Sequence, residues 1–276
     1  MDRIRLEKML NMTQETLKTY LLQTLLEMGR TVHSMDGFLY SPGTTPVLLC
    51  AHMDTVYNNP PSQIIKTFDG YEEVWSAADE DGIGGDDRCG IEIILEILEK
   101  KDVGVVFLED EEIGGKGAYA FTEYYSNRLK DDKYNYIIEI DRQGINEAVF
   151  YDCVNNDFTD FILEDEYFVE KIGSFSDISI IAPAINLSAV NLSAGYINEH
   201  CGSYEKIFVN ELDNIKCAIL DIINKDVSEP FEYKTDNSFS ACLLSRDLLA
   251  LENFADEEWA SSEFLNEDSW FDAPIG

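Results

Sequence analysis

Basic residues are scarce in this sequence, which has 20 lysines and arginines against 54 aspartates and glutamates and a formal net charge of −34. Nucleic acids and anionic membrane surfaces are bound through basic patches. The sequence therefore predicts neither a nucleic acid nor a membrane as partner. An acidic balance is compatible with an enzyme that depends on cations, although acidic surfaces often serve only to keep a protein soluble.

Long apolar runs and paired cysteines are also missing. No apolar run approaches the roughly 18 to 20 residues of a membrane helix, and the N-terminal segment MDRIRLEKML has mixed charge without a secretory apolar core. Six cysteines are scattered without a C-x-x-C pair, which indicates reduced thiols. We therefore expect a cytoplasmic protein. G-x-S-x-G, H-E-x-x-H and P-loop patterns are absent as well, which excludes the enzyme classes that depend on them.

With 276 residues, 45% of them hydrophobic, the chain is long enough to bury a good core. We predict a catalytic domain over residues 1–225. From residue 226 to 276 the sequence becomes strongly acidic with interspersed aromatic residues. This tail is expected either to dock onto the body or to be partly disordered.

Continuous apolar runs indicate the fold class. Residues 47–50, 103–108 and 134–140 are typical of strands buried on both faces, and residues 87–100 between two of them have helical periodicity. A helical crossover between parallel strands follows. The sequence predicts an α/β fold of three layers, with a mixed, mostly parallel sheet flanked by helices.

Other segments give coarser predictions. We expect one or two helices over residues 5–28 and a loop over 57–71. We also expect a helix over 157–171 and one or two strands over 178–194.

Side chains that suit a metal site follow these elements. His52 and Asp54 come after the first apolar strand, and an imidazole can bind a metal through one nitrogen while a carboxylate holds the proton on the other. Asp86 and Asp87 stand where a glycine-rich loop enters a helix. Acids at helix N-termini are commonly caps, and on its own this second pair favours that interpretation.

Three further segments supply carboxylates and an imidazole. Four consecutive acids, 109–112, follow the strand over 103–108, and Asp141 follows the strand over 134–140. His200 follows an apolar stretch and a glycine turn. Crowded carboxylates are costly unless a cation neutralises them, and the carboxyl ends of parallel strands meet at one edge of a sheet. Imidazoles and carboxylates without thiolates suit Zn, Co or Mn, and so many ligands suit two metals that share a bridging carboxylate.

The motifs AHMDTV, GDDRCG, EDEEIGGKGA, the aspartate of EIDRQG and AGYINEH resemble, in this order, the signature of the co-catalytic zinc exopeptidases. This superfamily includes peptidase T, glutamate carboxypeptidase and single-domain zinc aminopeptidases. The resemblance covers roughly residues 5–225. It implies two divalent metal ions, zinc first and cobalt or manganese as alternatives, held by His52, Asp86, Glu112, Asp141 and His200.

The same resemblance implies a role for each of these residues. His52 and His200 would be terminal ligands of different metals, Asp86 would bridge them, and Glu112 and Asp141 would complete the two sites. Asp54 would orient His52, and Glu111 would be the general base that takes a proton from the attacking water.

The sequence also departs from the pattern. Arg88 stands where many relatives have lysine, and the interval between Asp141 and His200 is too short for the lid or dimerisation domain of two-domain relatives. Asp177 falls where single-domain relatives often place an acid near the substrate, although an ordinary loop or cap acid is the alternative.

The expected function is a dinuclear metal-dependent exopeptidase that hydrolyses short peptides. One alternative is an N-acyl amino acid deacylase or similar amidohydrolase, because the same ligands would serve it. The other is a metal-binding protein without turnover that acts through its acidic, aromatic tail. The sequence does not set the oligomeric state.

Overall fold

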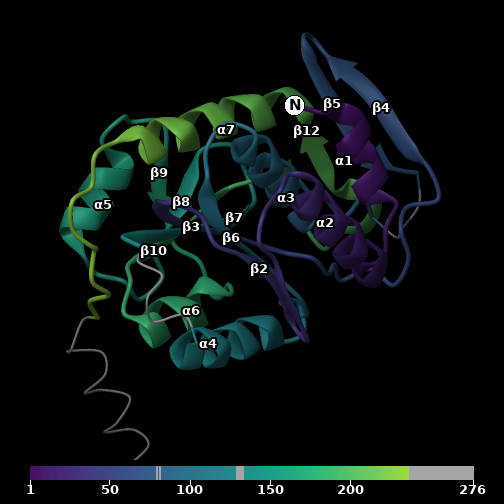
Figure 1. Cartoon of the computed structure of the whole chain (residues 1–276). Helices are drawn as coiled ribbons and strands as arrows, with labels where there is room; N and C mark the ends of the chain where they lie inside the picture. The colour runs from purple at the N-terminus through teal and green to yellow at the C-terminus, as the bar shows by residue number, and fades with distance from the viewer. Residues whose placement is uncertain (79, 81, 129–133, 236–276) are drawn as a thin grey trace, which may run out of the picture. The chain divides into compact units, whose positions relative to one another are not determined.

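A central eight-stranded sheet organises the computed structural model, which describes residues 1–78, 80, 82–128 and 134–235 (Figure 1). The strand order is β1-β2-β6-β3-β7-β10-β8-β9. The strands are β1 His33–Met35, β2 Phe38–Ser41, β3 Thr45–His52, β6 Val103–Leu108, β7 Tyr136–Arg142, β8 Glu147–Val149, β9 Val169–Lys171 and β10 Ala189–Ser193.

The four middle strands β6, β3, β7 and β10 run parallel to one another. Strands β1 and β2 continue the sheet antiparallel on one side, and β8 pairs antiparallel with β10 on the other. The predicted mixed, mostly parallel sheet is confirmed. In such a sheet the carboxyl ends of the parallel strands open toward one edge, where ligands bind.

Helices cover both faces of this sheet, as Figure 1 shows with α7 and α3 on one side and α4 and α6 on the other. Strand β3 explains the arrangement. Its Leu49 and Ala51 belong to one apolar cluster with helices α3 and α7, whereas Leu48 and Cys50 belong to the other with helices α4 and α6. The three-layer prediction is confirmed. The helices are α1 Arg3–Leu10, α2 Gln14–Glu27, α3 Gly85–Leu98, α4 Lys116–Arg128, α5 Asn156–Leu163, α6 Ile178–Ile185 and α7 Val209–Asn224.

A smaller four-stranded sheet, in the order β11-β12-β5-β4, stands beside the helices α1 and α3 (Figure 1). Its strands are β4 Ile64–Asp69, β5 Glu72–Ala77, β11 Tyr196–Ile197 and β12 Lys206–Phe208, and the 3₁₀ helix η1 Gly202–Tyr204 lies between the last two. Because β11 and β12 pair with each other and β12 pairs with β5, this sheet joins the segment around His200 to the segment before α3.

Three of the coarser predictions were right only in part. The helix expected over 157–171 ends at Leu163, after which Glu166 adopts a left-handed φ of 56° and the chain continues into β9. The one or two strands expected within residues 178–194 are present as the single strand β10. Residues 178–185 of that segment form α6 instead, because a short apolar run does not distinguish a buried helix from a buried strand. The expected loop over 57–71 contains β4, whose side chains are mostly exposed and give no apolar signal.

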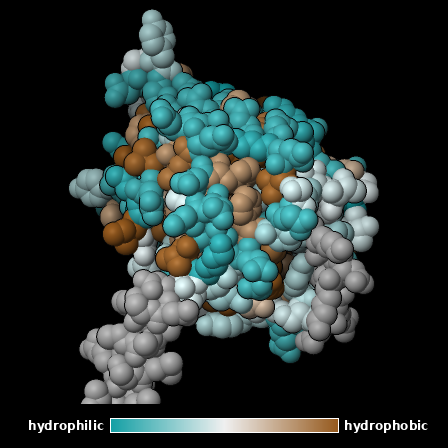
Figure 2. Space-filling view, turned by 90° about the vertical axis from the view of Figure 1, so that its left-hand side faces the viewer, coloured by the Kyte–Doolittle hydropathy of each residue, from teal (hydrophilic) through white to brown (hydrophobic). Residues whose placement is uncertain are grey.

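The end of the described chain runs along the body. The backbone N–H of Phe231 donates to the carbonyl oxygen of Asn135, its carbonyl oxygen accepts from the N–H of Ser188, and its ring packs against Tyr136 and Phe158. The predicted boundary at residues 225 and 226 stays a prediction, and most of the predicted tail, 236–276, lies outside the described residues. Within the part that the structure describes, no helix combines the length and the apolar character needed to span a membrane. The face in Figure 2 is mainly hydrophilic, with apolar side chains in small groups among polar ones.

Candidate metal centre

The sequence-predicted residues come from five segments that meet at the carboxyl edge of the central sheet. His52 is the last residue of β3, and Asp141 is the penultimate residue of β7. Glu111 and Glu112 follow β6, the strand on the other side of β3. Asp86 lies in the first turn of α3, and His200 lies in the loop between β11 and η1.

Asp86 stands between the two histidines. Its Oδ1 atom lies 2.8 Å from Nε2 of His52, and its Oδ2 atom lies 3.2 Å from Nε2 of His200. The two oxygens of one carboxylate therefore face two different imidazoles. This is the arrangement that a bridging ligand requires.

One further carboxylate accompanies each histidine. Asp141 Oδ1 lies 3.2 Å from Nε2 of His52, and Glu112 Oε1 lies 2.8 Å from Nε2 of His200. One ligand atom each from His52, Asp86 and Glu112 lie within 4.8 Å of one another, a grouping that could hold a metal ion. Nitrogen and carboxylate oxygen donors without thiolates suit zinc and similar divalent cations.

Asp54 contacts both His52 and the turn that carries Glu111 and Glu112. Its Oδ1 lies 3.2 Å from Nδ1 of His52, the ring nitrogen that faces away from Asp86. The backbone N–H groups of Glu111 and Glu112 donate to its two oxygens at 3.0 and 3.1 Å. Burial opposes ionisation of Asp54, but the hydrogen bond and charge of His52 outweigh it and lower the pKa. One carboxylate thus orients an imidazole and anchors the turn that carries two other site residues.

Negative charge dominates the centre. Burial raises the pKa of Asp141 to about 8, although the charge of His52 lowers it. Hydrogen bonds to Asp86 and Glu112 raise the pKa of His200 to about 11, and carboxylates around His52 outweigh its burial and raise its pKa as well. The carboxylates of Asp86, Asp141 and Glu112 lie together with two imidazoles, and divalent cations stabilise such a crowded set of carboxylates, so the residues present fit a metal centre.

The carboxyl group of Glu111 has a raised pKa. Burial raises it to about 7, the charge of His52 opposes this, and the neighbouring Glu112, Asp86 and Asp54 act in the same direction as burial. A carboxyl group poised near neutrality both accepts and returns a proton efficiently. Glu111 is one residue before Glu112 in the turn held by Asp54, which keeps it beside the candidate ligands.

The first turns of helix α3 can pack closely against the end of β7 because residue 90 is glycine. A Cβ atom there would stand 1.8 Å from the carbonyl oxygen of Ile140 and 2.4 Å from Oδ1 of Asp87. Asp87 is fully buried and accepts hydrogen bonds from the N–H groups of Gly90 and His52. The peptide bond between Asp86 and Asp87 is cis. The bond from the N–H of Gly90, three residues on, is a helix-capping contact, so the cap interpretation holds for Asp87, whereas Asp86 faces the two histidines.

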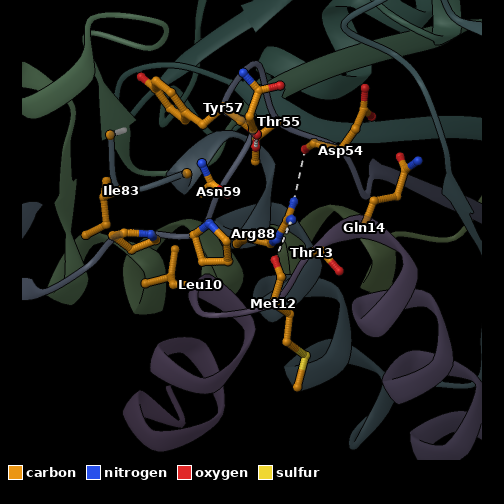
Figure 3. Close-up of a pocket in the computed structure, with 15 residues that line it drawn as sticks. Leu10, Met12, Thr13, Gln14, Asp54, Thr55, Tyr57, Asn59, Ile83 and Arg88 are labelled. Carbon is orange, nitrogen blue, oxygen red and sulfur yellow. Dashed lines mark hydrogen bonds between the residues drawn. The ribbon is translucent and has the colours of Figure 1, made fainter. Parts of the chain in front are cut away.

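Arg88 supports the other side of the centre and lines a pocket of about 270 Å³ between the loop after β3 and the loop between α1 and α2 (Figure 3). Its Nη1 donates to the backbone oxygen of Asp54 at 2.9 Å, and its Nη2 donates to that of Met12 at 3.3 Å. Burial lowers its pKa to about 10, while Asp54 and three other carboxylates act in the opposite direction. The sequence marked Arg88 only as a departure from lysine and did not indicate this contact.

Among the buried acids outside the predicted set of ligands and base, two have carboxylates without a hydrogen-bond partner among the described residues. Glu139 on β7 and Asp177 at the start of α6 are fully buried, and their carboxylate oxygens have no hydrogen-bond partner in the described part of the chain. Burial raises the pKa of both groups well above the ordinary range. The sequence had left Asp177 open between an acid near the substrate and an ordinary cap. The structure shows no side-chain cap bond from it.

No protein-family model matches the sequence, and no curated protein matches it. Solved structures do. An aminopeptidase PepT from Bacillus cereus superposes with a TM-score of 0.60 and 15% identity over 79% of this chain and 96% of that chain. A tripeptidase from Staphylococcus aureus superposes with a TM-score of 0.61 and 13% identity over 79% of this chain and 96% of that chain. A glutaminyl cyclase from Porphyromonas gingivalis superposes with a TM-score of 0.54 and 15% identity over 81% of this chain and 96% of that chain.

The chain has the fold of these enzymes. Their chemistry differs, since two are peptidases and one is a cyclase, and the identities are low. The activity therefore has to be argued from the residues of this chain.

Proposed function

We propose that this protein is a dinuclear metal-dependent exopeptidase that hydrolyses short peptides. The observation that carries the proposal is the position of Asp86, whose two oxygens face His52 and His200 separately. With Asp141 on one side and Glu112 on the other, the residues divide into two sets that share one carboxylate. Each set has one imidazole and two carboxylates, which suits zinc, cobalt or manganese.

The chain's own groups would share the work of peptide hydrolysis. Two divalent cations held there would polarise the scissile carbonyl and lower the pKa of a water molecule. Glu111, with a pKa raised to about 7, would take the proton from the attacking water and return it to the leaving amine. Asp54 would keep the Nε2 atom of His52 directed at the centre by holding Nδ1.

Hydrolysis of a peptide panel tests this proposal. Di- and tripeptides with free termini, with a blocked amino group or with a blocked carboxylate would be incubated with protein loaded with Zn, Co or Mn. We expect release of free amino acids, loss of release with a chelator, and dependence on at least one free terminus. Cleavage restricted to acyl-amino acids would support the deacylase alternative instead. A protein that is fully loaded with metal but cleaves nothing would overturn the enzyme proposal.

A further inference from the structure

The least enclosed of the candidate ligands is His200. Its side chain is 46% exposed, whereas that of His52 is 1% exposed. His200 lies in a loop, and both it and Asn198 adopt left-handed φ values of 61° and 57°. Such values are uncommon outside glycine and persist where the surroundings hold them. Some contact other than side-chain burial must therefore fix this loop relative to Asp86.

Glu205, five residues later, makes that contact. Its side chain is fully buried directly after η1. One oxygen, Oε1, accepts from the N–H groups of Gly85 and Asp86 at 2.7 and 3.3 Å, and Oε2 accepts from the N–H of Gly84 at 3.0 Å. Hydrogen bonds to an ionised acceptor are stronger than neutral ones. The Glu205 carboxylate, from the same segment as His200, thus accepts hydrogen bonds from the backbone N–H groups of three consecutive residues, Gly84 to Asp86.

The loop after β3 also contacts Glu205 and its segment, through Tyr57. Tyr57, from the loop after β3, accepts a hydrogen bond from the N–H of Gly202 at 3.0 Å, and its hydroxyl interacts with the Glu205 carboxylate. The ring passes over Gly82, where a Cβ atom would stand 2.1 Å from it. Glu205 is therefore a junction between the segments that carry His52, Asp86 and His200.

Glu205 does not belong to the candidate ligands, since both of its oxygens are taken by backbone N–H groups. We propose that Glu205 is a positioning residue, which fixes the separation of His200 from Asp86 and thereby sets the affinity for the cation on the His200 side. The inference rests on the proposed metal centre. Its distinctive consequence is asymmetry, because the His52 side is held independently by Asp54 and by burial in the sheet.

Glu205→Gln keeps the size of the side chain but places an N–H₂ group against the N–H of Gly84. Titration of the metal-free protein with Co²⁺, followed by calorimetry and by the visible absorption of bound cobalt, would resolve two binding steps. We expect the affinity of one step to fall by about 10- to 100-fold, as for other groups that orient metal ligands. The other step should stay within about three-fold, and the affected step should match the step lost in His200→Ala and not the step lost in His52→Ala.

Glu170→Gln, on the exposed strand β9, makes the same chemical change away from the centre and should leave both steps unaltered. If Glu205→Gln does not fold, Tyr57→Phe removes one hydroxyl and leaves the three backbone hydrogen bonds, and it should weaken the same step by a smaller factor. Equal weakening of both steps, or no change in either, would overturn the positioning role while leaving the proposed function intact. A wild-type chain that binds no second cation would instead contradict the metal centre itself.

Discussion

The Oδ1 atom of Asp86 lies 2.8 Å from Nε2 of His52, and the Oδ2 atom of the same carboxylate lies 3.2 Å from Nε2 of His200. One short side chain at the start of α3 therefore connects a histidine at the end of a central strand with a histidine in an exposed loop. If cations occupy the spaces between these groups, Asp86 contacts both of them.

The first prediction concerns Asp86 itself. Replacing it with asparagine removes the charge and leaves a single acceptor oxygen, so only one imidazole can still face an oxygen. We expect Asp86→Asn to lose at least one bound cation per chain and all measurable hydrolysis. Metal analysis after equilibrium dialysis checks this, with Asp160→Asn on the exposed face of α5 as a control that should bind as the wild type does. Full metal content in Asp86→Asn would contradict the bridging role.

The second prediction separates base from ligand. Glu111→Gln removes the proton acceptor but keeps the backbone N–H that Asp54 holds. We expect kcat to fall by about 10²- to 10⁴-fold, the usual contribution of a general base, with metal content unchanged. Steady-state kinetics alongside metal analysis measures both, and Glu170→Gln should alter neither. A Glu111→Gln enzyme with full activity and full metal content would remove Glu111 from the mechanism.

Asp54 gives the third prediction. It orients His52 and also accepts from two backbone N–H groups of the 111–112 turn. Asp54→Ala should weaken metal binding by about 10- to 100-fold, because partners of metal-binding histidines contribute that much. Asp54→Asn, which keeps an acceptor of similar shape, should lose less. Affinities from calorimetry compare the two variants, and equal effects of both substitutions would argue against the orienting role.

The fourth prediction concerns stability and pH. Burial raises the pKa of Asp177 in the folded chain, so the folded state keeps this proton at pH values where the unfolded state has lost it. The free energy of unfolding therefore decreases as the pH rises above about 4, and the Asp177 carboxyl group alone contributes up to about 1.4 kcal/mol per pH unit to this decrease. Asp177→Asn removes the titrating group.

We expect the free energy of unfolding of Asp177→Asn to increase relative to that of the wild type between pH 5 and pH 8. Urea unfolding of both proteins at several pH values, with a chelator present, measures the difference. Asp160→Asn, on an exposed position, should show no such growth. A difference between Asp177→Asn and wild type that is constant with pH would mean that Asp177 ionises normally in the folded chain.

The fold class was predictable because burial leaves a direct trace in the sequence. Val47 to Cys50 has no polar residue in a strand whose alternate side chains pack into two separate clusters, and this requires helices on both faces. Helix α6 and strand β4 were missed for the opposite reason. The run over 178–185 is apolar in a helix too short to show its period, and β4 exposes most of its side chains.

The candidate ligands and the contact of Asp54 with His52 were predictable, but the contacts of Glu205 and Arg88 were not. His52 and Asp141 could be placed from the strands that carry them, since parallel strands end at one edge. Glu205 and Arg88 act on backbone atoms of distant segments, Gly84 to Asp86 in one case and Asp54 and Met12 in the other. A backbone N–H or carbonyl has no signature in the sequence, so such contacts require the folded chain.

The central claim is that one carboxylate serves two cations, and the most direct test is the number of divalent cations bound per wild-type chain. Metal-free protein would be saturated with Zn²⁺, dialysed against metal-free buffer and measured by plasma mass spectrometry against the protein concentration. The proposal predicts two ions per chain in the wild type and fewer in Asp86→Asn. One ion or none in the wild type would contradict it.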